Sequence, residues 1–97
     1  MSSPGNMHVL MVMNGPEDGR VFEIGKESIS IGAAKEDDII ILSDPTLRPS
    51  HALLEKHNNQ FRLTKNWPAE KPGLLIQPGK CFTIGQTELL IKLRYQV

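Results

Sequence analysis

Short apolar segments separated by turn-forming residues limit the fold of this chain more than any other feature. The segment His8-Val9-Leu10-Met11-Val12-Met13 runs into the turn-rich residues 14–19, and Arg20-Val21-Phe22-Glu23-Ile24 ends at Gly25. In Ser28-Ile29-Ser30-Ile31 polar and apolar residues alternate, which is the period of a half-buried strand. No segment sustains a helical period over about ten residues. The pattern therefore predicts an all-β sandwich or barrel.

The second half of the chain continues this pattern. Ile39-Ile40-Ile41-Leu42 is a continuous run, mostly β-branched, and predicts a strand covered on both faces that ends at Ser43-Asp44-Pro45. Residues 66–73 form an irregular, proline-containing loop. The other strands predicted here are 51–56, 61–65, 74–76, 81–84 and 88–94. Residues 1–6 are small and polar and predict a flexible lead-in, which leaves 7–97 as a single domain.

Composition places the chain among ordinary soluble domains and excludes several function classes. Apolar residues make up 39% and charged residues 23% of the 97 residues. Eleven basic and eleven acidic side chains give zero net charge, which argues against a nucleic-acid binder that relies on a clustered basic excess. Apolar runs fall far short of the roughly 18 residues that span a bilayer, and no signal peptide opens the chain. We therefore expect a cytoplasmic protein without membrane insertion.

The single cysteine, Cys81, excludes an internal disulfide and a cysteine-based zinc cluster. Because Cys81 sits in an apolar strand segment, we interpret it as a small buried hydrophobe instead of a reactive thiol. The sequence thus gives no role to sulfur chemistry.

The residues that could support catalysis do not form a known site. His8, His51 and His57 lack the spacing of an H-E-x-x-H metal motif, and no serine lies in a G-x-S-x-G sequence. The glycines of 15–19 lack the spacing of a phosphate-binding loop. We interpret Asp37-Asp38 as a solvated pair in a loop. The sequence therefore predicts no enzyme, no metal site and no cofactor.

Five segments resemble, in their order, the forkhead-associated (FHA) domain family. They are Gly19–Ile24, Ile29-Ser30-Ile31-Gly32, Asp38–Leu47, His51-Ala52-Leu53-Leu54 and Leu75–Leu89. Each segment is a weak signal alone, and their order and spacing make the match specific. The resemblance implies a single-domain, two-sheet antiparallel β-sandwich (FHA/SMAD-like) whose end loops bind phosphothreonine peptides.

The chain departs from the family where phosphate would be bound. A phosphate carries nearly two negative charges and needs a guanidinium together with hydroxyl and backbone donors. In the family these donors come from an Arg after the Ile-Gly pair, an S-R-x-H motif and an Asn-Gly loop. This chain has Ala33 after its Ile-Gly pair, Arg48 and Pro49 in place of the Ser and Arg of S-R-x-H, and residues 66–73 in place of the Asn-Gly loop.

Loss of these donors predicts a degenerate site. One charge-assisted hydrogen bond contributes about 1.5–3 kcal/mol, whereas a micromolar affinity corresponds to about 8 kcal/mol in total. We therefore predict a protein–protein interaction module that works independently of phosphothreonine, with a protein or peptide partner that the sequence does not identify. Gly32 and His51 are expected to be structural, since the resemblance implies that His51 braces the loop.

The alternative function is phosphopeptide binding through a rewired anion site that uses Arg48 and neighbouring lysines. An enzyme-class alternative is a small hydrolase that uses His51. Trp67 is either a lid on the end of the sandwich or an anchor for a partner. Self-association through an edge strand such as 88–94 also stays open. The candidate ligand- or partner-binding residues are Arg48, Ser50, Lys35, Lys65, Asn66 and Trp67.

Overall fold

Nine strands and their connecting loops make up the chain in a computed structural model, which describes residues 6–57, 60–66 and 73–95. The first residue of β1 is Asn6, so the strand begins at the last residue of the predicted lead-in, one position before the predicted start of the domain. None of the described residues forms a helix with the length and apolar character needed to cross a bilayer. The strands are β1 (Asn6–Val12), β2 (Val21–Glu23), β3 (Ser28–Gly32), β4 (Ile39–Ile40), β5 (Ala52–His57), β6 (Gln60–Lys65), β7 (Leu74–Ile76), β8 (Cys81–Ile84) and β9 (Thr87–Tyr95).

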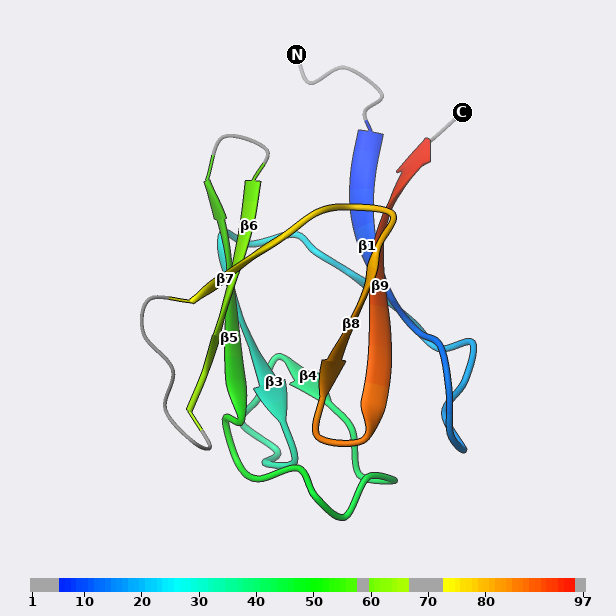
Figure 1. The fold of residues 1–97 in the computed structure, drawn as a ribbon, viewed down its shortest axis with the longest axis vertical. Helices are drawn as coiled ribbons and strands as arrows, with labels where there is room; N and C mark the ends of the chain where they lie inside the picture. The colour runs from blue at the N-terminus through cyan, green and yellow to red at the C-terminus, as the bar shows by residue number, and fades with distance from the viewer. Residues whose placement is uncertain (1–5, 58–59, 67–72, 96–97) are drawn as a thin grey trace.

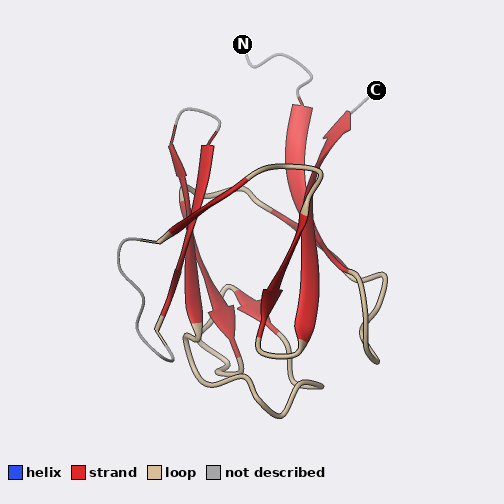
Figure 2. Ribbon diagram, in the orientation of Figure 1, coloured by secondary structure: helices blue, strands red, loops and turns tan. Residues whose placement is uncertain are grey.

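The strands form two sheets that face each other as the layers of a sandwich (Figures 1 and 2). One sheet has the order β2-β1-β9-β8 and the other has the order β4-β3-β5-β6-β7. Strand β9 pairs with both β1 and β8, so it is a central strand. The prediction that 88–94 is an edge strand is therefore wrong. Local sequence does not encode strand order, and here the last strand inserts beside the first.

All neighbouring strands are antiparallel except β3 and β4, which are parallel. The parallel pair arises because residues 33–38 double back along β3 before the chain enters β4. Asp38 holds this return, since its backbone N–H donates to the Ser30 hydroxyl at 3.0 Å and its Oδ2 accepts from the Ser30 N–H at 3.0 Å. The predicted antiparallel sandwich thus contains one parallel edge pair.

The hydrophobic core lies between the sheets and is built from alternate strand positions. Ile29, Leu54 and Leu63 are in register on β3, β5 and β6, and Leu10 faces them from the other sheet together with its neighbour Ile91. All five side chains are almost fully buried. Burial of each aliphatic side chain contributes about 1.5–3 kcal/mol, so these positions dominate the stability of the fold.

Two predicted burial patterns are wrong. The run Ile39–Leu42 is not a strand covered on both faces, because β4 ends at Ile40 and the side chain of Leu42 is 74% exposed. Cys81 is exposed as well, since Phe82 and Ile84 take the inward positions of β8 and leave Cys81 on the outer face. Leu42 is exposed because the strand ends before it, and Cys81 is exposed because the alternation of β8 turns it outward, although both residues are apolar.

Three connections lie at one end of the sandwich, the lower end in Figure 1: residues 33–38 after β3, residues 41–51 after β4, and the turn between β8 and β9. The beginning of β1 and the end of β9 lie at the opposite end, where Asn6 pairs with Tyr95. We call the lower end the loop end; its connections contain the predicted site residues Lys35, Arg48 and Ser50.

Candidate functional site

A buried carboxylate, that of Asp37, organises the loop end. Its side chain is only 5% exposed. Its Oδ2 accepts hydrogen bonds from the backbone N–H of Ala34 at 3.0 Å and of Ser50 at 2.9 Å, and its Oδ1 accepts one from the Ser50 hydroxyl at 2.8 Å. One carboxylate therefore joins the β3–β4 loop to the β4–β5 loop. The interpretation of Asp37-Asp38 as a solvated pair is wrong for Asp37.

The backbone beside this carboxylate is tightly packed. A Cβ atom at Gly32 would lie 2.5 Å from Asp37 Oδ2 and 2.6 Å from both the Arg48 carbonyl oxygen and the Ser50 nitrogen. Ser50 has a φ of 46°, in the left-handed region that a residue with a Cβ adopts at a cost of about 1–2 kcal/mol. Its two hydrogen bonds to Asp37 offset that cost and hold the turn in place.

His51 fixes the same turn from its other side. Its side chain is buried, and its Nδ1 accepts a hydrogen bond from the Arg48 N–H at 3.1 Å. The Asn66 side chain donates to the Ser50 carbonyl at 2.8 Å, and the Asn66 N–H donates to the His51 carbonyl at 2.9 Å. The Arg48 carbonyl accepts from the Ala33 N–H at 3.1 Å. These contacts fit the bracing role predicted for His51.

A second buried carboxylate, Asp44, connects the β4–β5 loop to the other sheet. Its Oδ1 accepts from the Thr46 N–H at 2.9 Å and from the Thr46 hydroxyl. Its Oδ2 accepts from the Gln86 N–H at 2.8 Å and the Thr87 hydroxyl at 2.7 Å. Gly85 packs directly against this group with a φ of +61°. Hydrogen bonds at the loop end therefore connect the β4–β5 loop to the turn between β8 and β9 in the other sheet.

The protonation states at the loop end follow from these contacts. Burial alone would raise the pKa of the Asp37 carboxyl, but the hydrogen bonds from Ser50 and Ala34 outweigh burial and lower it. The pKa of Asp44 is lowered in the same way, by Thr46 and Thr87 against the effect of burial. Burial lowers the pKa of His51, and the positive charge of Lys65 lowers it further. At neutral pH both carboxylates are thus ionised and His51 is neutral.

The structure brings some of the predicted binding residues together. Ser50 bonds to the Asp37 carboxylate, Asn66 donates to the Ser50 and His51 carbonyls, and the Arg48 carbonyl accepts from Ala33, so these three predicted residues meet at one turn. Lys35 is exposed in the β3–β4 loop, and Lys65 ends β6, close enough to His51 for its charge to affect the pKa. Trp67 lies outside the described residues.

Sequence reasoning missed Asp37 as the centre of this cluster. Its donors come from Ser50, thirteen positions away in the chain, so no local pattern marks the carboxylate as buried. A signal that could have found it is Gly32, because a buried glycine beside two loops indicates that another group approaches its Cα closely.

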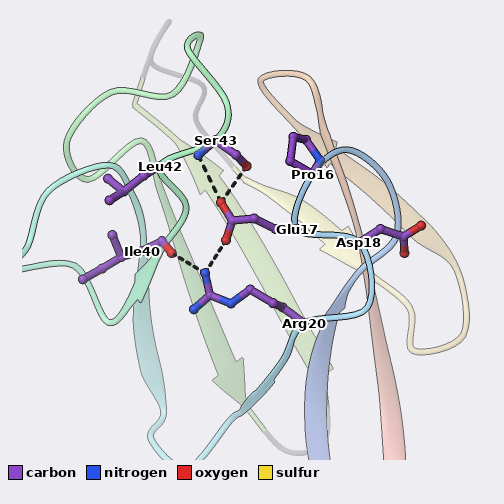
Figure 3. Close-up of a pocket in the computed structure, with 7 residues that line it drawn as sticks. All are labelled: Pro16, Glu17, Asp18, Arg20, Ile40, Leu42 and Ser43. Carbon is purple, nitrogen blue, oxygen red and sulfur yellow. Dashed lines mark hydrogen bonds and ion pairs between the residues drawn. The ribbon is translucent and has the colours of Figure 1, made fainter.

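A separate groove lies between the β1–β2 loop and β4 with the residues that follow it (Figure 3). The Glu17 carboxylate links the two sides: Oε2 accepts from the Ser43 N–H at 3.0 Å and its hydroxyl at 2.6 Å, and Oε1 pairs with the Arg20 guanidinium. The guanidinium also lies over the Phe22 ring, 4.6 Å from its centroid. The open groove has a volume of about 710 Å³ and is lined by Pro16, Glu17, Asp18, Arg20, Ile40, Leu42 and Ser43.

The side chains that line the groove do not form an acid–base or nucleophilic catalytic site. Hydrogen bonds from Ser43 are the main cause of the lowered pKa of Glu17, and a carboxylate with a lowered pKa is a weak base for activating the Ser43 hydroxyl. Among the residues that the structure describes, no group of three or more His, Cys, Asp or Glu side chains could hold a metal ion. The geometry of the loop end and of the groove beside Glu17 supports binding through surface contacts.

The sequence matches a protein family over residues 11–94, and that family is described as the cytoplasmic domain of the inner-membrane component of the type III secretion system. The chain belongs to this family. A comparison with curated proteins finds no match.

Solved structures share the fold at low sequence identity. An FHA domain of the CT664 protein from Chlamydia trachomatis superposes with a TM-score of 0.74 at 17% identity, covering 89% of this chain and 96% of that one. The cytoplasmic domain of PscD, a type III secretion sorting platform protein from P. aeruginosa, gives 0.71 at 17%, covering 87% and 78%. A structure from a study of phosphothreonine-dependent FHA domain interactions gives 0.72 at 16%, covering 91% and 97%.

These comparisons confirm the predicted fold class and the FHA resemblance. The chain is an all-β, two-sheet sandwich of the FHA type. The match to this family was not predicted, since the sequence motifs led only as far as the FHA domain.

Proposed function

We propose that this chain is a cytoplasm-facing domain of an inner-membrane component of a type III secretion system, and that it binds a neighbouring protein of that system without phosphothreonine. Family membership over residues 11–94 supports the first part of the proposal. The structural likeness to PscD, a sorting platform protein, supports partners within the secretion machinery. The single observation that carries the second part is the position of the Asp37 carboxylate.

Asp37 takes the donors that an incoming phosphate would need. The Ala34 N–H and both the N–H and hydroxyl of Ser50 are directed at this carboxylate. The Ala33 N–H is used by the Arg48 carbonyl, and Pro49 has no N–H to offer. A phosphate at the same place would therefore find its backbone donors in use.

Charge acts in the same direction as hydrogen bonding. The pKa of Asp37 is lowered, so the carboxylate is negative at neutral pH. A dianionic phosphate about 5 Å away would be repelled by about 2 kcal/mol even at the dielectric constant of bulk water, and more strongly near a partly buried group. That repulsion is a factor of about thirty in affinity.

Titration of the chain with phosphothreonine peptides and their unphosphorylated counterparts tests this proposal. We expect no saturable difference between the two sets by calorimetry. In parallel, partners captured from a bacterium that carries the secretion system should include its components and should be retained after phosphatase treatment. Loss of these partners after phosphatase treatment, or micromolar binding confined to phosphorylated peptides, would contradict the proposal.

A second candidate function keeps an anion site based on Arg48. One observation favours it: the charges of Lys65 and Arg48 both lower the pKa of His51, so two cationic side chains lie near the same turn. This candidate predicts phosphopeptide binding that Arg48→Ala removes, with Lys80→Ala as an exposed control on the turn before β8. Equal binding in both variants would eliminate it.

A further inference from the structure

The outer face of the four-stranded sheet carries a row of apolar residues where a solvated sheet face is normally polar. Antiparallel sheets with one face in water alternate between apolar inward and polar outward residues. On β1 the inward side chains Leu10 and Val12 belong to the core, which places Val9 and Met11 on the opposite side of the strand. Val9 is only 1% exposed, whereas Met11 is half-buried and reaches the surface. On β9 the core residues Leu89 and Ile91 likewise place Leu90 outward.

The strand register gathers these outward residues into one row across the sheet. Met11 on β1 pairs with Val21 on β2 and with Leu90 on β9, and Leu90 pairs with Cys81 on β8. The four side chains span about 14 Å, at about 4.8 Å per strand. Val21 is 42% exposed, Cys81 is exposed, and Met11 and Leu90 are half-buried. We call Val21, Met11, Leu90 and Cys81 the outer row.

The other sheet of the same protein provides a comparison. The outward positions on β3, β5 and β6 are polar or charged apart from Leu53. These positions are Ser28, Ser30, Leu53, Glu55, His57, Gln60, Arg62 and Thr64. On β7 the outward residue Leu75 is 58% exposed, but it pairs with Arg62. No outward row across β3, β5, β6 and β7 is therefore apolar throughout, whereas the outer row is, and a continuous apolar row indicates a surface that is covered in the working protein.

We propose that a second copy of this chain covers the face, outer sheet against outer sheet, with the two-fold axis along the outer row. Under this symmetry each residue of the row faces its own copy, and a residue two positions before the row faces the residue two positions after it. On β9 this rule places Glu88 of each copy opposite Lys92 of the other. Two ion pairs thus form at the border of an apolar centre.

The rest of the face fits the same arrangement. On β1 the row is flanked by Met13, which is half-buried, and by Val9, which is only 1% exposed and adds little contact area, so no charge lies beside the row on this strand. Glu23 on β2 lies opposite Gly19, so no two like charges meet. The chain carries zero net charge, and two copies therefore approach without overall repulsion. Charge complementarity of the face with itself is the reason for choosing a second copy as the occupant.

The expected dimer is weak. Four strands at about 4.8 Å and five positions from Glu88 to Lys92 at about 3.4 Å give a flat footprint of about 330 Å² per copy. This footprint is less than half of the roughly 800 Å² per partner of a standard protein interface, and its size fits a transient association. The association does not depend on the proposed function, because it requires no other protein.

Sedimentation of the whole chain over a concentration series from low micromolar to low millimolar tests the proposal. We expect a monomer–dimer equilibrium that Leu90→Lys weakens at least tenfold, because two lysines then face each other in an apolar interface. Leu53→Lys is the matched control on the outer face of the other sheet, and it should leave the dimer unchanged. Circular dichroism spectra of both variants check that the sandwich is folded.

Charge reversal tests the axis itself with surface substitutions that leave the core intact. Glu88→Lys and Lys92→Glu should each weaken the dimer several-fold, and the double variant should restore it because the opposite charges face each other again. A short bismaleimide should also join two chains through Cys81, the only cysteine, and Cys81→Ser should abolish this product.

Three results would overturn the proposal. The first is a chain that stays monomeric at every concentration. The second is a dimer that Leu53→Lys disrupts and Leu90→Lys does not. The third is a dimer that the single charge reversals weaken and the double variant fails to restore. If Leu90→Lys removed a different captured protein while the wild-type chain stayed monomeric, the outer face would belong to that protein and self-association would be refuted.

Discussion

Replacing Asp37 separates the effect of hydrogen bonding from that of charge at the loop end. Asp37→Ala removes the acceptor for the Ala34 N–H, the Ser50 N–H and the Ser50 hydroxyl. A buried donor left without a partner costs about 1–3 kcal/mol, and the hydroxyl can turn to another acceptor. With two backbone donors stranded, we expect a loss of about 3 kcal/mol in the free energy of unfolding. For a chain of this size the melting temperature should fall by about 12–24 °C.

Asp37→Asn is the matched control. The amide oxygen can accept from both backbone N–H groups, and the amide nitrogen can donate to the Ser50 hydroxyl, which rotates. The variant therefore keeps the hydrogen-bond geometry and loses only the charge, so we expect a loss of about 1 kcal/mol or less. Urea unfolding followed by circular dichroism measures both variants. If Asn proved as destabilising as Ala, or if Ala cost less than about 1 kcal/mol, the role given to these hydrogen bonds would be incorrect.

Two further predictions concern stability. Gly85→Ala should cost about 2–4 kcal/mol, because its φ is +61° and its Cβ would lie 2.5 Å from the Thr46 hydroxyl and 2.9 Å from the Asp44 carboxylate. Gly79→Ala, with a φ of +90° and open space around it, should cost only about 1 kcal/mol by the same unfolding assay, and equal losses would argue against crowding at Asp44. The pKa values of His8 and His51 are lowered from 6.5, so each binds its proton more readily in the unfolded chain. The stability that these two groups contribute should therefore be complete above pH 6.5 and fall as the pH drops below it. The urea midpoint at pH 7.5 and pH 5.5 measures this effect, because the carboxylates stay ionised over that range. An unchanged midpoint would contradict the lowered pKa values of His8 and His51.

The strands were largely predictable because a strand with one buried face shows alternating apolar and polar residues in the sequence. Ser28 to Ile31 alternates, and β3 forms there with Ile29 and Ile31 inward. The same rule, applied strictly, would have placed Cys81 outward with Thr83, since Phe82 and Ile84 are the larger apolar residues of β8. The error arose from weighing the type of residue above its alternate position.

The site was less predictable because its contacts join distant parts of the chain. Asp44 accepts from Gln86 and Thr87, more than forty positions away, and the burial of such a carboxylate depends on those donors. The FHA resemblance located Arg48, Ser50 and His51 at one turn, which the structure reproduces. It did not indicate that Asp37 would occupy the space between the loops.

The pairing of the first strand with the last has a consequence for biosynthesis. The five-stranded sheet uses residues 28–76, whereas the core of the other sheet needs β1 and β9 together. A ribosome that adds about 5–20 residues per second takes roughly 1–4 s to make residues 77–95. During that interval β1, with apolar residues on both of its faces, is available but has no β9 to pair with. The nascent chain therefore exposes an aggregation-prone strand until synthesis of this domain is nearly complete, and that strand is a natural target for ribosome-associated chaperones.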